Sequence, residues 1–345
     1  MKPYNSLLVL LFGMMLACVI LIFRMSELKD MFSFLTLTRI KPTEEGPNTK
    51  YTYETQQARH DQLQKFCSTH QNIHYTRKYD ANLMYSQKQK IMYCHIPKVA
   101  CSTWKKIMAY FLGLLKSPWK DVTLAEVSQI LIFFISCIFP CVYSYFCIDF
   151  FFFQLYGFDI PSFQTASNLT INQIKSNKNY LSFMFARHPY DRLFSAYRNK
   201  FLDPVNLGYL KHYGPMIISM DVNPLSHRKR SDGLYRITFE QFVKFVIKAG
   251  PDFDDHWRPQ TRICHICDLD YKYLGKFETM EIDANYIFKT LNESLKFPKM
   301  TEYKLKTTQI LKKYYTELPQ PLMKQIFEFY RNDFDAFGYD PNYFF

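Results

Sequence analysis

The sequence predicts an α/β fold, a central parallel sheet flanked by helices, with a transmembrane helix ahead of it at the N-terminus. Short apolar runs that are typical of buried strands alternate along the chain with amphipathic helical patterns. The 345 residues are 48% hydrophobic and 18% aromatic, which suffices for a large packed core and argues against disorder. An uncharged apolar run near the N-terminus predicts the membrane helix.

That run, SLLVLLFGMMLACVILIF at residues 6–23, is 18 residues long, about the minimum for a membrane span. The following RMSELKD offers no convincing cleavage site, which favours an uncleaved signal anchor over a cleaved signal peptide. Residues 1–5 carry only positive charge and are expected to form a cytoplasmic tail. Polar residues 24–60 then form a stem, and residues 61–345 a single luminal domain.

Two further features fit an oxidising lumen. Asn168 and Asn292 each begin an Asn-x-Ser/Thr sequon for glycosylation. Cys264 and Cys267 form a C-x-x-C motif, but no second C-x-x-C motif accompanies it as a four-cysteine zinc site would require. We therefore expect these cysteines to pair with cysteines elsewhere in the chain.

The remaining elements follow from periodicity and from Pro and Thr residues at helix starts. Strands are expected where apolar runs are short and continuous, and helices where apolar residues recur every three or four positions. In chain order the elements are a polar helical region at 61–86, a strand at 90–96, a helix at 102–115, a strand at 180–186 and helices at 189–201, 236–248 and 318–339.

One apolar segment does not fit this pattern. Residues 130–148 carry no charge, and four phenylalanines follow Asp149, so hydropathy predicts a second membrane span. A single crossing there would place residues 91–112 and 180–201 on opposite sides of a bilayer. Our preferred explanation is that part of residues 120–156 is a translated intron or another gene-model error. As real protein it would have to form an external hairpin or a membrane-dipping loop.

The stretch PKVACSTW, residues 97–104, has the features of an anion-binding loop between a strand and a helix. Lys98 supplies a cation, the following backbone amides and the helix N-terminus bind an oxyanion, and Ser102 or Thr103 is expected to cap the helix. The loop contains no glycine, and we expect small residues to suffice because only a positive φ or a very close approach requires glycine. The alternative is an ordinary capped turn with a surface lysine.

A second candidate anion site follows the second strand. Arg187 comes directly after the apolar run, and Ser195 lies two turns into the next helix. An arginine binds phosphate through a bidentate fork, and a helix hydroxyl can bind another oxygen. Two anion sites, each anchored on a strand, predict a ligand with two separated anionic groups.

The motifs PKVACSTWK and RHPYDRLFSAYRNKF, followed by DDHWRPQTRIC, CDLDYKYLGKFETMEIDA and YRNDFDAFGYD, resemble those of Golgi carbohydrate sulfotransferases. The closest likeness is to sulfotransferase family 2, in the branch of the chondroitin and dermatan 4-O-sulfotransferases and the human-natural-killer-1 epitope sulfotransferase. It runs from about residue 61 to 342 and is interrupted near 120–156. It implies a P-loop-like sulfotransferase fold, a single-pass type II protein of the Golgi membrane and no metal.

In that family the first motif holds the 5′-phosphosulfate of 3′-phosphoadenylyl sulfate (PAPS), and the second motif holds its 3′-phosphate. The family commonly has Arg-Asp-Pro where this chain has Arg-His-Pro, and we expect the arginine to keep its role because the histidine need not face the phosphate. By resemblance, the residues expected at the co-substrate are Pro97, Lys98, Val99, Ala100, Cys101, Ser102, Thr103, Trp104, Arg187, His188, Pro189, Tyr190, Asp191, Arg192, Leu193, Phe194 and Ser195.

The resemblance also assigns catalytic roles. Lys98 is expected to neutralise charge on the leaving phosphate. His256, in DDHWRPQ, is the candidate base, with Asp254 or Asp255 to orient it. His95 and His188 are weaker candidates. In the alternative interpretation, His256 only packs or binds sugar.

The expected reaction moves the sulfuryl group of PAPS to a sugar hydroxyl, foremost the 4-hydroxyl of GalNAc in chondroitin or dermatan. A formal charge of +12 and the HRKR run at 227–230 suit an anionic glycosaminoglycan or glycoprotein glycan, and no nucleic acid is implied. Arg258 and Arg262 are candidates to meet acceptor carboxylates.

The G-x-x-x-x-G-K-[ST] motif of nucleotide kinases is absent. The alternative is a catalytically inactive luminal glycan-binding relative, because of the apolar segment.

Overall fold

The computed structural model describes residues 49–70, 82–115, 117–119, 174, 179–203, 207–220, 228–298 and 310–342. The predicted anchor, the apolar segment at 120–156 and Asn168 lie outside these residues. Across the described ranges, no helix combines the length and the apolar character that a membrane crossing needs. The first described helix, α3 (Thr49–Thr69), starts inside the range that the sequence predicted as stem and ends well before residue 86.

The sheet has four strands in the order β1 (Leu83–Ser86), β2 (Ile91–Cys94), β3 (Leu181–Ala186) and β4 (Tyr273–Lys276). The pairs β2–β3 and β3–β4 are parallel, whereas β1 runs antiparallel to β2. The predicted parallel sheet is therefore mixed, because only residues 87–90 connect β1 to β2 and so short a connection forms a hairpin.

The pairing of β2 with β3 also bears on the apolar segment between them. In this register Tyr93 lies opposite Phe183, and Cys94 lies opposite Met184. The strand–loop–helix units on either side of residues 120–156 therefore belong to one sheet. A single membrane crossing between them is incompatible with this arrangement.

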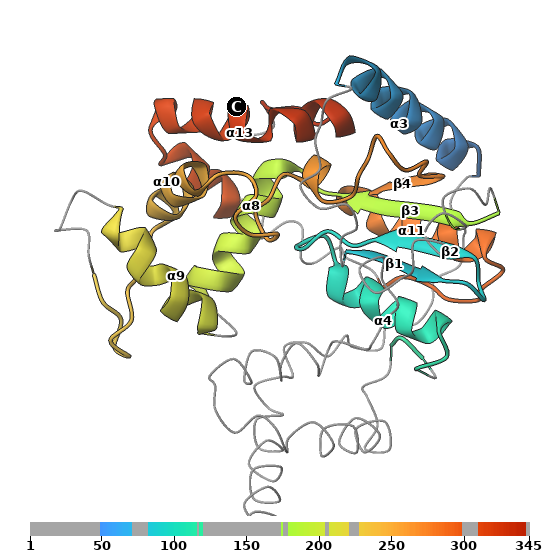
Figure 1. Cartoon of the computed structure of the whole chain (residues 1–345), viewed down its shortest axis with the longest axis horizontal. Coiled ribbons are helices and arrows are strands. Elements are labelled where there is room, and N and C mark those ends of the chain that lie inside the picture. Colours follow the sequence, from blue (N-terminus) through green and yellow to red (C-terminus); the bar gives the residue numbers. More distant parts are fainter. Residues whose placement is uncertain are drawn as a thin grey trace, which may run out of the picture. The chain divides into compact units, whose positions relative to one another are not determined.

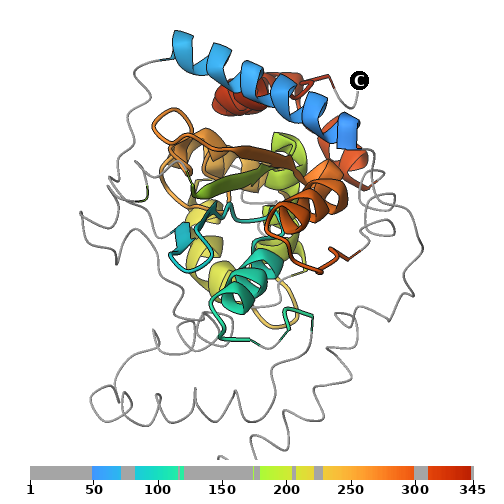
Figure 2. The ribbon, with the colours of Figure 1, turned by 90° about the vertical axis from the view of Figure 1, so that its right-hand side faces the viewer.

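Helices cover both faces of the sheet (Figures 1 and 2). After β2 comes α4 (Cys101–Phe111), and after β4 comes α11 (Met280–Thr290). From α4, Trp104 packs on Phe183 and Phe185 of β3 and on Phe288 of α11. On the opposite face, Figure 2 shows α3 and α13 (Gln320–Phe337) above the strands. Alternation along β3 thus places its phenylalanines on the α4 side.

A second core lies among helices beside the sheet. It is formed by α8 (Pro189–Tyr197), α9 (Gly208–Ser219), α10 (Phe239–Ala249) and α13 (Figure 1). Helix α8 continues into a π-helical turn, η2 (Arg198–Leu202). Helix α10 begins with a capping box, in which the Thr238 hydroxyl accepts from the Gln241 backbone N–H. Within this core, α8 and η2 follow directly after β3 of the sheet.

The C-x-x-C motif forms two separate disulfides, as predicted. Cys67 of α3 pairs with Cys267, and Cys94 at the end of β2 pairs with Cys264. The bridges span 200 and 170 residues of sequence, so each ties the segment before β4 to a distant element. Cys94 stands three residues before the predicted anion loop at 97–104, and its bridge ties down the end of the strand that leads into that loop.

Removing the Cys94–Cys264 bridge with paired alanine substitutions is expected to lower the free energy of unfolding by about 2–5 kcal/mol, because the unfolded chain loses a long cross-link. Denaturant unfolding of the purified protein measures this change. Cys101→Ser is the matched control, since Cys101 carries a free thiol, and should leave the midpoint nearly unchanged. Equal midpoints for the bridge variant and the wild type would contradict the prediction.

Candidate active site

The loop between β2 and α4 adopts a conformation that its sequence disfavours. Lys98 has a φ of 71° and Ala100 a φ of 54°, both in the left-handed region. The expectation that a glycine-free loop avoids positive φ is therefore wrong. Such backbone costs about 1–2 kcal/mol per residue and persists only where surrounding contacts fix it.

Two buried arginines of the second motif supply those contacts. The Arg187 Nη1 donates to the carbonyl of Lys98 at 2.9 Å, and the Arg192 Nε donates to the carbonyl of Pro97 at 2.9 Å. Both guanidinium groups come from the segment that follows β3, the strand next to β2. The second motif therefore stabilises the backbone conformation of the first motif.

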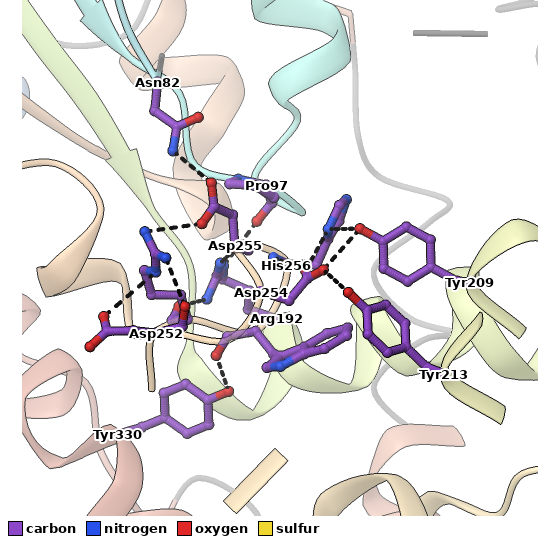
Figure 3. A network of polar contacts seen from close by, with 12 residues as sticks. Asn82, Pro97, Arg192, Tyr209, Tyr213, Asp252, Asp254, Asp255, His256 and Tyr330 are labelled. Carbon is purple, nitrogen blue, oxygen red and sulfur yellow. Dashed lines mark hydrogen bonds and ion pairs between the residues drawn. The ribbon is translucent and has the colours of Figure 1, made fainter. Parts of the chain in front are cut away.

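Arg192 also links the loop between β2 and α4 to a third motif, the DDHWRPQ segment (Figure 3). Its Nη2 and Nη1 donate at 2.7 Å to the carbonyls of Asp255 and Arg258, in the DDHWRPQ segment. Its side chain is 1% exposed and makes three hydrogen bonds to protein carbonyls. These contacts occupy the guanidinium and give Arg192 a positioning role, in place of the co-substrate contact that the resemblance implied.

Helix α4 begins without a side-chain cap. The N-cap residue is Ala100, and neither Ser102 nor Thr103 caps the helix as predicted, because both stand inside its first turn. The first amides of an α-helix have no acceptor within the helix, and the helix dipole adds partial positive charge there. The N-terminus of α4 is therefore suited to hold a phosphate or sulfate oxygen beside Lys98.

Three further cations act electrostatically on Lys98 at this helix start. Burial lowers the pKa of Lys98 to about 7, and the positive charges of Lys200, Arg187 and Arg198 contribute to the lowering. Within the described residues, Lys98 forms no ion pair with a carboxylate. Such crowding of like charges is relieved when an anion binds. Arg198 and Lys200 were missed in the sequence; they stand in the YRNK run just after the predicted Ser195.

Ser195 itself lies half-buried on α8. It stands three residues before Arg198, so the two side chains lie on the same side of the helix. The π-helical turn at 198–202 then brings Lys200 toward Lys98 and the candidate base. Single π-turns inserted in helices are frequent at functional sites.

His256 sits in a polar network with Asp254 and Tyr209 (Figure 3). Its Nδ1 lies 2.9 Å from Asp254 Oδ1, and the Tyr209 hydroxyl donates to Asp254 Oδ2 at 3.0 Å. The Tyr209 oxygen is also 2.9 Å from the same Nδ1. Of the two orienting residues considered, Asp254 is therefore the one in contact. With Nδ1 directed at Asp254, Nε2 is the nitrogen placed to accept a proton.

The electrostatic surroundings favour the neutral form of His256. Burial lowers its pKa, and the charges of Lys200 and Lys98 lower it further, while the Asp254 carboxylate opposes them. The Lys200 ammonium also stands 3.8 Å from the centre of the Tyr209 ring, a cation–π contact. The candidate base and the candidate anion site thus share their neighbouring cations.

The other two histidines are less suited. His95 is buried, its Nδ1 lies 3.1 Å from the Asn82 carbonyl, and burial lowers its pKa to about 3. His188 Nε2 lies 3.0 Å from the Asp340 carbonyl, and the ring packs on Phe334 of α13. This histidine therefore faces α13 rather than the cation cluster, although the resemblance placed His188 at the co-substrate.

Arg258 and Arg262 are committed to carboxylates of the protein. Arg258 Nη1 lies 3.0 Å from Asp255 Oδ1, and Arg262 Nη1 lies 2.6 Å from Asp252 Oδ2. Arg258 is 3% exposed, which leaves no surface for a glycan. The expectation that Arg258 meets an acceptor carboxylate is therefore wrong, and its role is to anchor the segment that carries His256.

Several residues predicted at the co-substrate have side chains in the two cores instead. They are 2% exposed or less and pack on other aromatic or aliphatic groups, so they position the two motifs without offering a ligand surface. These residues are Trp104, Tyr190, Leu193 and Phe194.

Comparisons with known proteins identify relatives of this chain. The family model described as "Sulfotransferase family" matches residues 81–340, which include both anion-binding motifs and His256. Carbohydrate sulfotransferase 11 of Rattus norvegicus is 28% identical over 273 residues, covering 76% of this chain and 68% of the relative. Carbohydrate sulfotransferase 14 of Danio rerio is 28% identical over 262 residues, covering 75% and 62%.

Carbohydrate sulfotransferase 9 of Homo sapiens is 26% identical over 302 residues, covering 84% of this chain and 61% of the relative. No solved structure shows a significant match. Because the family model spans the sheet, both motifs and the closing helix, the chain belongs to the sulfotransferase family and is a sulfate-transferring enzyme that uses PAPS.

Proposed function

We propose that this enzyme is a carbohydrate sulfotransferase that moves the sulfuryl group of PAPS to a hydroxyl of an anionic glycan. The observation that carries the proposal is the position of His256, oriented by Asp254, within the field of Lys98 and Lys200. A base beside a cation cluster suits an alcohol acceptor and a phosphosulfate donor. The relatives' names, all carbohydrate sulfotransferases, support a sugar as the acceptor.

Each group has a defined part in the proposed reaction. The sugar hydroxyl attacks sulfur in line, an S–O bond to the sugar forms, and the S–O bond to the 5′-phosphate breaks. His256 Nε2 takes the hydroxyl proton. Lys98 and the α4 amides stabilise charge on the departing 5′-phosphate of 3′,5′-adenosine bisphosphate.

At the other end of the donor, Arg198 and Ser195 bind the 3′-phosphate in this proposal. Arg187 contributes charge there and holds the loop through the Lys98 carbonyl. Arginine forks and helix hydroxyls are common partners of phosphate. A donor without the 3′-phosphate would forgo these contacts.

For the acceptor we propose the 4-hydroxyl of GalNAc in chondroitin or dermatan. The formal charge of +12 supports a polyanionic acceptor. Transfer of labelled sulfate to chondroitin, desulfated dermatan and a glycoprotein glycan, followed by disaccharide analysis, tests this choice. Label at position 4 of GalNAc is expected; label only on the glycoprotein glycan would overturn the acceptor and leave the activity intact.

The same assay addresses the segment at 120–156. The full chain and a chain lacking these residues are compared. Activity only in the shorter chain would support the view that the segment is foreign to the enzyme. If both chains fold and bind PAPS but transfer nothing, the protein is instead a glycan-binding relative without activity.

We also propose a single-pass type II location in the Golgi membrane, with residues 6–23 as anchor and the catalytic domain in the lumen. The two disulfides support an oxidising compartment. Asn292 is exposed in the turn after α11, where a glycosyltransferase can reach it.

Asn292→Gln is therefore expected to remove one N-glycan, because the sequon is lost from a luminal surface. The readout is the glycosidase-sensitive mobility shift of the protein expressed in animal cells. Ser294→Thr preserves the sequon and serves as the matched control. An unchanged shift in Asn292→Gln would contradict glycosylation at this site.

A further inference from the structure

A short basic hairpin stands apart from the cation cluster of the active site. The Arg236 N–H donates to the Arg228 carbonyl and the Arg230 N–H donates to the Leu234 carbonyl, both at 2.8 Å. This pairing brings the side chains of residues 228–230 and 236 into one region, which Figure 1 shows beside α9. Arg228, Lys229 and Arg236 are exposed, and Arg230 is half-buried against Asp232 at 3.2 Å.

The hairpin borders a cavity of about 780 Å³. Arg230 and Arg236 line it from the hairpin, and Glu240 and Glu317 line it from α10 and from the helical segment before α13. Tyr314 contributes part of an aromatic ring. The volume is in the range of ligand-binding clefts, about 300–1,000 Å³.

The cavity adjoins the segment that carries the active-site cations. Tyr197 and Phe201 form part of its wall, and they belong to α8 and η2. The same short segment holds Arg198 and Lys200, whose charges act on Lys98. The cavity and the active-site cations therefore share one helical segment.

The mixture of charges indicates the chemical class of ligand. The two carboxylates in the wall repel most strongly a ligand of dense negative charge, such as a nucleotide phosphate, although Glu240 is partly neutralised by Lys244 at 2.7 Å. They accept hydrogen bonds from sugar hydroxyls, however, and the arginine forks bind carboxylate or sulfate groups. A ligand with many hydroxyls and spaced negative charges satisfies both kinds of side chain.

We propose that the hairpin and the cavity bind an acidic stretch of the acceptor polysaccharide, several sugars away from the one that receives sulfate. This inference rests on the proposed function, in which the acceptor is an anionic glycan. It assigns to the HRKR run a role in holding long acceptors, so that affinity rises with chain length.

The test uses the full chain and size-defined chondroitin oligosaccharides. In Arg230→Gln/Arg236→Gln, the Kd for a dodecasaccharide is expected to rise about tenfold or more, because two charge-assisted contacts are lost. The Kd values for a tetrasaccharide and for 3′,5′-adenosine bisphosphate are expected to stay unchanged. Lys65→Gln/Lys324→Gln, which removes two exposed charges from α3 and α13, is the matched control.

Several outcomes would overturn the inference. They are an unchanged dodecasaccharide affinity, equal weakening of both oligosaccharides, loss of 3′,5′-adenosine bisphosphate binding, and no oligosaccharide binding by the wild-type chain. Equal weakening would assign the cavity to the reacting sugar, and loss of nucleotide binding would assign it to the donor. Normal oligosaccharide binding without sulfate transfer would contradict the proposed function alone.

Discussion

Lys98→Ala is expected to lower kcat/KM for sulfate transfer by about 10²–10³-fold, or about 3–4 kcal/mol. The lysine ammonium stands at the start of α4, where charge develops on the leaving phosphate, and no carboxylate among the described residues neutralises it. Initial rates with PAPS and chondroitin measure the loss. Lys106→Ala, on the same helix, is the matched control and should retain most of the activity.

The same lysine gives donor binding a defined pH dependence. In the free protein the pKa of Lys98 is about 7, because of burial and neighbouring cations, so Lys98 loses its charge as the pH rises through 7. A bound anion raises this pKa, so binding takes up a proton above pH 7. Affinity for 3′,5′-adenosine bisphosphate is expected to fall from pH 6.5 to 8.5, and in Lys98→Ala this dependence should disappear. A wild-type affinity that is constant over this range, or an unchanged rate in Lys98→Ala, would contradict the role of Lys98.

His256→Ala is expected to lower kcat by about 10²–10⁴-fold while donor affinity stays within about twofold of wild type, because a general base acts in the chemical step. Asp254→Asn should also lower kcat, since the amide no longer holds the Nδ1–H tautomer through its 2.9 Å contact. Tyr209→Phe removes one hydrogen bond to Asp254 and is expected to have a smaller effect. Isothermal titration with 3′,5′-adenosine bisphosphate separates binding from catalysis.

The acidic limb of the pH profile reports on His256. Its pKa in the free protein is lowered by burial and by Lys200 and Lys98, so kcat/KM should stay high below the ordinary pKa of histidine, about 6.5. When the donor is bound, its negative charges offset those of Lys200 and Lys98, so the His256 pKa rises. The acidic limb of kcat should therefore lie at higher pH than the acidic limb of kcat/KM. In Lys200→Gln, the acidic limb of kcat/KM is expected to shift to higher pH, because one of the cations that lower the His256 pKa is removed. If His256→Ala transferred sulfate at the wild-type rate, the base would have to be another group.

The strand–loop–helix units could be predicted from the sequence because local patterns determine them. The apolar run before Pro97 and the run before Arg187 each form a strand that ends at the site. Strand β1 was not predicted, because its residues lie in the polar range 61–86 that the sequence assigned to a helical region, and its pairing with β2 depends on the complete fold. The disulfide partners Cys67 and Cys94 likewise depend on the complete fold.

Within the site, charge and chemistry were predictable, but the contacts that hold the site together were not. Arg192 binds carbonyls of residues 63 to 95 positions away, and backbone carbonyls leave no signal in a sequence. The positive φ of Lys98 and Ala100 is imposed from outside the loop, so the absence of glycine was misleading. Tyr209 comes from α9, whose sequence gave no indication that it meets His256.

The most direct test of the central claim measures transfer of labelled sulfate from PAPS to chondroitin alongside binding of 3′,5′-adenosine bisphosphate. Three proteins are compared, namely the wild-type chain, Lys98→Ala and His256→Ala. The account predicts transfer by the wild type, loss of transfer with retained nucleotide binding in His256→Ala, and weakening of both in Lys98→Ala. Wild-type transfer rates in both variants, or a folded wild-type chain that binds the nucleotide and transfers nothing, would contradict it.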